Sequence, residues 1–255
     1  MTEFEGKRAV VTGASKGIGL AVVEALVAGG AHVIAAARSS SARLDELAAS
    51  GSVTFVSADL GKVDAAAALR LDDQPVDILV NNVGHAAPRV GGFLALSDED
   101  FVDSLSLNLM STVRATRVLL PSLLLRGGVI VNIASVNAEL ADPLVIDYSA
   151  AKAAVENFTK SISAEFGPTV RAVAVNPGPV STDLWLGSGG VAEVVAAQGG
   201  GKPEDVAAAA ASGAATKRFT RAEEVADLVA FLASDRAANI TGASFRIDGG
   251  LVPTI

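Results

Sequence analysis

Cysteine is absent from the 255-residue chain, so disulfide bonds and thiol catalysis are excluded. Only two histidines are present, His32 and His85, which leaves little material for a histidine-based metal site or a Ser-His-Asp triad. No metal site is therefore expected. Aromatic residues make up 4% of the chain, so the core has to be built from Ala, Val, Leu and Ile.

Excess positive charge and long apolar runs are also missing. The formal net charge is −8, whereas a nucleic-acid partner requires a basic face. The apolar stretch from Val118 to Ala134 is broken by Arg126-Gly127-Gly128 and is too short to span a membrane. The N-terminal residues Met1–Glu5 lack the apolar segment of a secretory signal. We therefore expect a cytoplasmic protein with neither a nucleic-acid nor a membrane partner.

Short apolar runs alternate with helix-like segments along the whole chain. Strands are expected at Ala9–Thr12, His32–Ala37, Val53–Ala58, Ile78–Asn81, Val129–Ala134, Val170–Asn176 and Ser244–Ile247. Strands that are apolar on both faces and separated by helices predict a parallel sheet covered on both sides, and right-handed crossovers make it doubly wound. The pattern predicts a single-domain Rossmann-type α/β fold over residues 1–255, with a seven-stranded, mostly parallel sheet and helices on both faces.

The longest helices are expected at Asp98–Leu125 and Asp147–Phe166, with Pro121 kinking or ending the first of them. Residues 183–219 interrupt the alternation with many glycines, including Gly199-Gly200-Gly201, and with five alanines at 207–211. A flexible low-complexity connection is one interpretation. Pro203 suits the first turn of a helix, however, and alanine is the best helix former. We therefore expect two short helices with glycine hinges that form a mobile lid over the substrate.

A glycine-rich segment, Thr12 to Gly19, follows the first expected strand and precedes a helix-like segment. A strand, a glycine turn and a helix together hold a dinucleotide pyrophosphate at the helix N-terminus, and glycine lets the backbone approach the phosphates. The spacing is G-x-x-x-G-x-G rather than the commoner G-x-G-x-x-G, and a turn that only connects two elements is the alternative. We assign cofactor binding here to Gly13, Ser15, Lys16, Gly17, Ile18 and Gly19.

A second group of residues lies far downstream, with Ser135 followed by Tyr148-Ser149-Ala150-Ala151-Lys152. Together with the glycine turn, it resembles the short-chain dehydrogenase/reductase family in its shorter, single-domain branch. The resemblance extends from about Phe4 to Gly250, and six landmarks in the right order argue against chance agreement. The others are Asn81-Asn82-Val83-Gly84, Asn108, Asn176-Pro177-Gly178 and Ile247-Asp248-Gly249-Gly250.

Tyr148, the only tyrosine, is four residues from Lys152, so the two share one face of a helix. The Lys152 ammonium, the positive nicotinamide ring of the oxidised cofactor and exclusion of water are expected to lower the pKa of Tyr148 from about 10. Its hydroxyl then exchanges a proton with a carbonyl or alcohol oxygen, which Ser135 also hydrogen-bonds. The resemblance implies that Asn108 holds a water in a proton relay to Lys152. Core packing is the alternative role for an isolated tyrosine.

The residues after the second expected strand bear on the choice of cofactor. Folds that select NAD place an acid near this point, but here Ala37 is followed by Arg38 and Ser39. A guanidinium grips the 2′-phosphate of NADP, and Lys16 and the Ser39 hydroxyl are suited to assist it. We therefore expect NADP(H) rather than NAD(H). The alternative is that Arg38 and Lys16 are solvated surface cations.

The remaining cofactor contacts are assigned to the segments that follow the other strands. The resemblance implies that Asp59 and Leu60 lie at the adenine, although an Asp here also commonly caps a helix. Strand ends line the ligand crevice of this architecture, which assigns Asn81, Val83 and Gly84 to the cofactor. By resemblance, Tyr148 and Lys152 also contact it, and its nicotinamide lies against Pro177, Gly178, Val180 and Thr182.

The resulting hypothesis is an NADP(H)-dependent oxidoreductase that interconverts a small-molecule carbonyl and a secondary alcohol. A nucleotide-binding or sensing protein without catalysis is the alternative, and the complete set Asn108, Ser135, Tyr148 and Lys152 weighs against it. An epimerase or dehydratase acting on a sugar nucleotide would need a larger C-terminal substrate domain.

The residues expected to shape the substrate pocket are Val136, Asn137, Leu144, Trp185 and the lid, and most of them are small or apolar. An apolar ketone, a polyketide-like ring, a steroid and a 3-oxoacyl thioester all suit such a pocket. The long helices carry many apolar residues, such as Leu105, Leu109, Val155 and Phe158. One face of the sheet cannot cover all of this apolar surface, and exposed apolar patches usually mark an interface. We expect a homo-oligomer, and the resemblance implies a tetramer.

Overall fold

The computed structural model describes residues 2–70, 74–199 and 201–253. Its centre is a sheet of seven strands in the order β3-β2-β1-β4-β5-β6-β7, and every neighbouring pair is parallel. The strands are β1 (Arg8–Thr12), β2 (His32–Ala37), β3 (Val53–Ser57), β4 (Ile78–Asn81), β5 (Val129–Ile133), β6 (Arg171–Pro177) and β7 (Ser244–Ile247). The doubly wound fold is confirmed, and each expected strand end is correct to within one residue.

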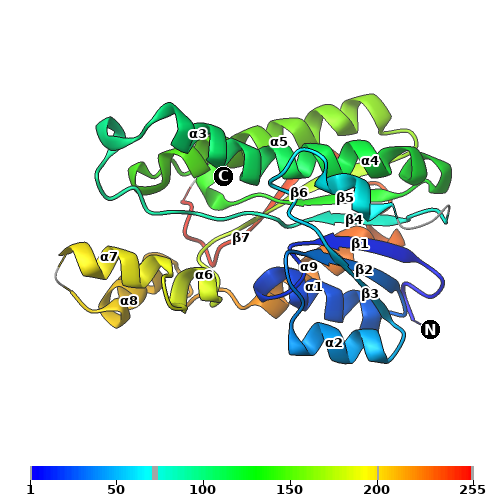
Figure 1. The fold of residues 1–255 in the computed structure, drawn as a ribbon, viewed down its shortest axis with the longest axis horizontal. Helices are drawn as coiled ribbons and strands as arrows, with labels where there is room; N and C mark the ends of the chain where they lie inside the picture. The colour runs from blue at the N-terminus through cyan, green and yellow to red at the C-terminus, as the bar shows by residue number, and fades with distance from the viewer. Residues whose placement is uncertain (1, 71–73, 200, 254–255) are drawn as a thin grey trace.

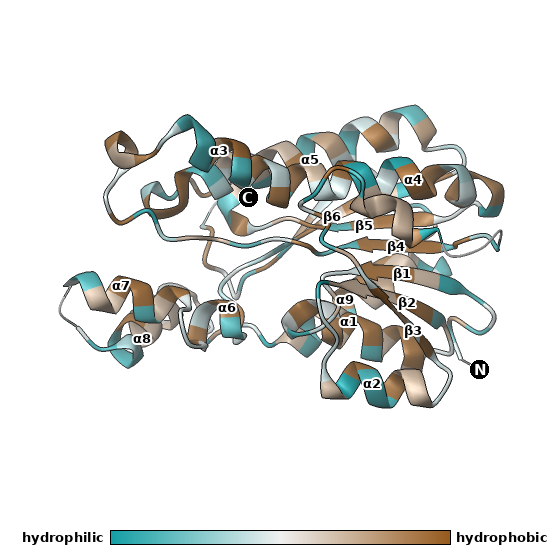
Figure 2. Cartoon of the chain, viewed as in Figure 1, coloured by the Kyte–Doolittle hydropathy of each residue, from teal (hydrophilic) through white to brown (hydrophobic). Residues whose placement is uncertain are grey.

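Helices cover both faces of the sheet (Figure 1). One face packs against α1 (Gly17–Ala28), α2 (Ala42–Ala49) and α9 (Ala222–Ala233), and the other packs against α4 (Ser111–Arg126) and α5 (Ile146–Phe166). The strands bury apolar side chains on both sides, so that Val11 contacts the first layer and Val10 the second. The strands are accordingly mostly brown in Figure 2. Burial from both sides explains why they show no alternation of polar and apolar residues.

The strand order reverses between β1 and β4, because β2 and β3 extend the sheet on one side of β1 and β4 to β7 on the other. In open parallel sheets the ligand crevice lies beyond the carboxyl ends of the strands at such a reversal. The glycine turn Thr12–Gly19 follows β1, and Asn82 follows β4. The fold therefore brings these segments to one crevice.

The expected helix Asp98–Leu125 consists of three parts: α3 (Asp98–Leu105), a π-helical turn at Ser106–Met110, and α4. The prediction that Pro121 ends the helix was wrong, because α4 continues to Arg126. Pro121 and Arg117, four residues earlier, are both exposed. The Arg117 carbonyl, which the missing N–H of Pro121 leaves unbonded, therefore lies on the solvent side, where water satisfies it.

Residues 183–213 form three helices rather than the expected two: α6 (Asp183–Leu186), α7 (Val191–Gly199) and α8 (Pro203–Gly213). They extend away from the sheet, at the lower left of Figure 1. Pro203 occupies the first turn of α8, which confirms the expected helix start, and Gly189, between α6 and α7, has a φ of 71°. Gly200, also assigned to a hinge, lies outside the described residues.

The short helical turns are at Ala65–Leu69, Phe93–Ala95, Val136–Ala138, Pro143–Val145 and Asp235–Ala237. Within the described parts of the chain, no helix combines the length and hydropathy needed to cross a bilayer.

Candidate active site

The glycine turn has a backbone that side chains would obstruct. Gly13 and Gly17 have φ angles of 65° and 55°, in the left-handed region. A Cβ atom at Gly19 would lie 2.1 Å from the Gly13 carbonyl oxygen. These glycines leave the start of α1 open to a ligand, which fits the pyrophosphate of a dinucleotide.

Asn82 supports this turn from the end of β4. Its Nδ2 donates to the carbonyl oxygens of Thr12 (3.2 Å) and Gly13 (3.1 Å), and its backbone N–H donates to the Thr12 hydroxyl at 3.0 Å. From the sequence, Asn82 was recognised only as part of the segment Asn81–Gly84 and was given no role of its own. Its neighbour Asn81 is buried and donates to Asn132 Oδ1 at 2.8 Å. The Asn81 side chain therefore belongs to an internal polar network, and Val83 and Gly84 are the residues at the crevice.

The segment after β6 closes the crevice opposite the glycine turn. A Cβ atom at Gly17 would lie 3.2 Å from Thr182 Cγ2, and the Lys16 ammonium lies 3.6 Å from Asp183 Oδ2. Val180 is buried and forms a bridge with Thr220. Gly178 follows Pro177 and packs so closely that a Cβ there would lie 2.9 Å from Asp248 Cα. The structure thus brings two sets of predicted cofactor residues to the same place.

The predicted cofactor-selecting cations lie at the rim of the crevice. Arg38 and Ser39 are exposed at the end of β2, and the Lys16 side chain is 73% exposed. Burial lowers the pKa of His85, and the charges of Arg38 and Lys16 lower it further. Their positive field therefore reaches the segment that follows β4. Asp59 accepts a hydrogen bond from the Gly61 N–H at 3.2 Å, and Leu60 beside it is buried.

Tyr148 and Lys152 share one face of α5 beside the end of β5. The Lys152 ammonium lies 5.6 Å from the centre of the Tyr148 ring and donates to the Ile133 carbonyl oxygen at 2.8 Å. A Cβ atom at Gly84 would lie 3.1 Å from Lys152 Nζ and 3.0 Å from Asn108 Oδ1. Gly84 therefore separates the ammonium from the Asn108 amide, and the absence of a side chain leaves them close to each other.

The pKa of Tyr148 is raised rather than lowered. Burial penalises the phenolate and raises the pKa, and a hydrogen bond from Ser135 opposes the rise only in part. Lys152 faces the ring and bonds to Ile133, so the protein's own groups do not produce the lowered pKa that we expected. Burial also lowers the pKa of Lys152, to about 8. At neutral pH the site therefore holds a neutral phenol and an ammonium.

Asn108 and Ser135 are both fixed by short-range hydrogen bonds. Asn108 lies in the π-helical turn and is 1% exposed. Its Oδ1 accepts from the His85 N–H at 2.8 Å, and its Nδ2 donates to the carbonyl oxygens of His85 and Ser104, both at 3.1 Å. The Ser135 hydroxyl, at the end of β5, accepts from the Asn137 N–H at 3.1 Å. The Ser135 hydroxyl in turn donates to Asn137 Oδ1 at 3.2 Å.

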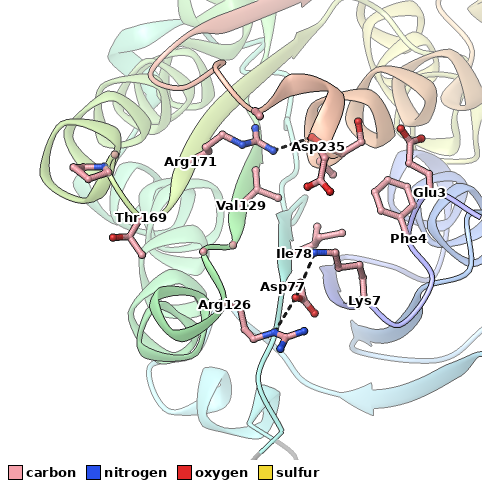
Figure 3. Close-up of a pocket in the computed structure, with 17 residues that line it drawn as sticks. Glu3, Phe4, Lys7, Asp77, Ile78, Arg126, Val129, Thr169, Arg171 and Asp235 are labelled. Atoms are coloured by element: carbon pink, nitrogen blue, oxygen red, sulfur yellow. Dashed lines mark hydrogen bonds and ion pairs between the residues drawn. The ribbon is translucent and has the colours of Figure 1, made fainter.

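The residues predicted to shape a substrate pocket differ in their surroundings. Val136 is buried and Leu144 is half-buried, while the Trp185 ring packs edge-on against Phe219 with the ring centres 5.5 Å apart. A cavity of about 410 Å³ lies next to the Val136–Ala138 turn. Its lining includes Asn137, Pro143, Ile146 and Ser149. A second cavity, of about 250 Å³, lies at the amino-terminal ends of the strands, where β4, β5 and β6 begin (Figure 3).

Comparisons with known proteins agree with this geometry. A family model described as Enoyl-(Acyl carrier protein) reductase matches residues 13–252. L-xylulose reductase of Bos taurus is 34% identical over 253 residues, which cover 98% of this chain and 98% of that protein. A 3-oxoacyl-(acyl-carrier-protein) reductase of Escherichia coli (strain K12) is 35% identical over 97% of this chain and 98% of its own. The structure of L-sorbose reductase from Gluconobacter frateurii, complexed with NADPH and L-sorbose, matches with a TM-score of 0.90 and 32% identity, and covers 100% of both chains.

Proposed function

The chain belongs to the short-chain dehydrogenase/reductase family of oxidoreductases, and from this we propose that it interconverts a small-molecule carbonyl and a secondary alcohol with NADP(H) as cofactor. The observation that carries the proposal is the convergence of four side chains at one crevice. Asn108, Ser135, Tyr148 and Lys152 come from three separate segments, yet they meet beside the glycine turn.

The glycine turn fits a dinucleotide, because Gly13, Gly17 and Gly19 have no side chains that would obstruct a close approach of the backbone to the pyrophosphate. In this proposal the turn, with Ser15 and Ile18, holds the pyrophosphate, and Asp59 and Leu60 lie at the adenine. Arg38, Lys16 and Ser39 bind the 2′-phosphate. Pro177, Gly178, Val180 and Thr182 bind the nicotinamide. When bound, the cofactor supplies or accepts the hydride.

Tyr148 acts as the general acid when the carbonyl is reduced. Its raised pKa keeps the phenol protonated, which is the form that donates a proton to the substrate oxygen. Ser135 hydrogen-bonds the same oxygen. The Lys152 ammonium stabilises the phenolate that remains, and Asn108 is placed to hold a water between the ammonium and solvent. In the oxidative direction the same groups work in reverse.

Residues 183–219 form a substrate lid in this proposal, within one catalytic domain that comprises the whole chain. Glycines at 187, 189 and 190 join α6 to α7, and α6 begins next to the proposed nicotinamide site at Thr182. Trp185 then lies at the substrate side of the cofactor. A lid of this kind excludes water from the hydride transfer.

Replacing Tyr148 with Phe tests the proposal, because it removes the hydroxyl and leaves the ring packing. We expect turnover of the best substrate in a panel of carbonyls and alcohols, measured at the nicotinamide absorbance, to fall about 10²- to 10⁴-fold. NADPH binding and the melting temperature should not change. Normal turnover by Tyr148→Phe would show that the proposed mechanism is wrong, and failure of the wild type to reduce or oxidise any compound would favour a non-catalytic nucleotide-binding role.

A further inference from the structure

Arg89, in the segment between β4 and α3, connects the first turns of two helices. Its Nη2 lies 2.6 Å from Asp147 Oδ2, with Nε at 3.2 Å from the same oxygen. Its Nη1 lies 3.1 Å from Asp100 Oδ1. Asp147 is in the first turn of α5, and Asp100 belongs to the capping box that begins α3. One guanidinium therefore fixes the start of α5 relative to the start of α3.

Asp147 directly precedes Tyr148, and its side chain is only 3% exposed. Burial opposes ionisation of the Asp147 carboxyl. The Arg89 hydrogen bonds and charge nevertheless hold its pKa below the ordinary value, assisted by a hydrogen bond from Ser104. The charged pair is thus retained next to the residue that we propose as the general acid.

Asp100 extends the connection toward Asn108. It lies in the first turn of α3, and α3 continues into the π-helical turn that carries Asn108. At this junction the Ser104 hydroxyl is 3.3 Å from Asn108 Nδ2, and the Ser104 carbonyl oxygen accepts from the same Nδ2 at 3.1 Å. Arg89 therefore holds the helix of Tyr148 through Asp147 and the helix that leads to Asn108 through Asp100. Ser104 and Asn108 are both buried.

We propose that Arg89 is a positioning residue for the reaction: through Asp147 on α5 and Asp100 on α3 it sets the distance between Tyr148 and Asn108. This inference rests on the proposed function. A buried ion pair gives little net stability, because desolvation offsets the attraction. The geometry that it imposes is a better reason for its presence, because small displacements of proton-transfer groups are costly in rate.

The matched variants are Arg89→Met and Arg126→Met. Arg126 also binds a buried carboxylate, because its Nε lies 3.0 Å from Asp77 Oδ1. This pair lies at the amino-terminal ends of β4 and β5, away from the candidate active site (Figure 3). We expect Arg89→Met to lower kcat about 10- to 100-fold with the KM for NADPH unchanged within about twofold. Arg126→Met should keep the wild-type kcat. Arg89→Lys retains a cation for Asp147 without the paired geometry, so its kcat should be intermediate, and it serves as the test if Arg89→Met does not fold.

Combination with Tyr148→Phe separates positioning from general damage. If Arg89 acts through Tyr148, then Arg89→Met should reduce the residual activity of Tyr148→Phe by less than about threefold, because coupled residues are not additive. Equal kcat values for Arg89→Met and Arg126→Met, or a full additional loss in the double variant, would overturn the inference. An active Tyr148→Phe would instead overturn the proposed function.

Discussion

Lys152 is a buried ammonium whose nearest polar contact is a backbone carbonyl, and this gives the protein a specific pH dependence. Its pKa in the folded protein is about 8. In the unfolded chain it is about 10.4. Below pH 8 both states are protonated and the folded protein bears the full cost of the buried charge. Between pH 8 and about 10.4 the unfolded chain binds more protons, so the contribution of Lys152 to stability increases with pH.

We therefore predict that the free energy of unfolding of the wild type increases with pH relative to that of Lys152→Met, by about 3 kcal/mol in total between these pKa values. Urea unfolding of both proteins at pH 7.5 and 9.5 should show about 2 kcal/mol of this difference, because pH 9.5 is still below the pKa of the unfolded chain. Other titrating groups are common to both proteins and cancel. Parallel stability curves would show that Lys152 is not desolvated as the structure indicates.

Arg38 is the residue on which the proposed preference for NADPH over NADH depends. A charge-assisted hydrogen bond to the 2′-phosphate is worth about 1.5–3 kcal/mol, so kcat/KM should favour NADPH over NADH by about 10- to 100-fold. The double variant Ala37→Asp, Arg38→Leu should reverse the preference. Because Arg38 is exposed, the preference should also weaken with added salt.

A nearby arginine provides the control for this experiment. Arg43 binds Glu24 at 2.6 Å and Glu46 at 2.8 Å, so Arg43→Leu should leave the cofactor ratio unchanged. A wild type that prefers NADH would mean that Arg38 is only a solvated cation.

Single residues could be predicted from the sequence where their chemistry is local. Tyr148 and Lys152 are one helical turn apart, and the glycines between Thr12 and Gly19 predict the backbone conformation of the turn that contains them. Asn82 and Arg89 could not be identified in this way, because Thr12 lies 70 positions from Asn82 and Asp147 lies 58 positions from Arg89. The raised pKa of Tyr148 was missed for a similar reason: it comes from burial of the phenol, and the Lys152 ammonium on the same helix bonds to the Ile133 carbonyl of β5, 19 positions away.

At the scale of elements, the strands and the helix starts were predicted well because burial and capping leave a local pattern. The π-helical turn was not, since Ser106–Met110 contains no proline or glycine and has an ordinary helical composition. It adds a residue to the helical repeat and places Asn108 in the interior. The unexpected helix in the segment 183–213, α6, has only four residues and lacks a periodic signal.

Pro121 lies inside α4, where its missing N–H removes one helical hydrogen bond. Pro121→Ala restores a helical hydrogen bond to the Arg117 carbonyl within α4. Proline costs about 3 kcal/mol relative to alanine inside a helix, and the lost rigidity of the unfolded chain offsets up to about 1 kcal/mol. We expect stabilisation of about 2 kcal/mol in urea unfolding with unchanged kcat. A lower midpoint would mean that the proline ring makes a contact that the helix needs.

For the whole molecule, the expected homo-oligomer depends on apolar surface that the chain does not cover. Val155 does not contribute, because it is 1% exposed, and Leu105, Leu109 and Phe158 are half-buried by the chain's own contacts. The exposed apolar residues of the long helical segment lie elsewhere. They cannot be identified from the sequence, because the spacing of apolar residues along a helix does not show which of its sides the loops cover.

The apolar surface that remains includes Val102 on α3, together with Phe93 and Leu94 in the turn before it. Val102 and Leu94 are 62% and 97% exposed, and Phe93 packs edge-on against Phe101 of α3, which unites the patch. Burial of such a patch between copies is worth about 25 cal/mol per Å². We predict a tetramer in light scattering at micromolar concentration, and a shift toward smaller species for Val102→Asp. Val63→Asp, at a valine in the loop after β3 that is 72% exposed, should leave the mass unchanged. A single 25.6 kDa species in the wild type would refute the prediction.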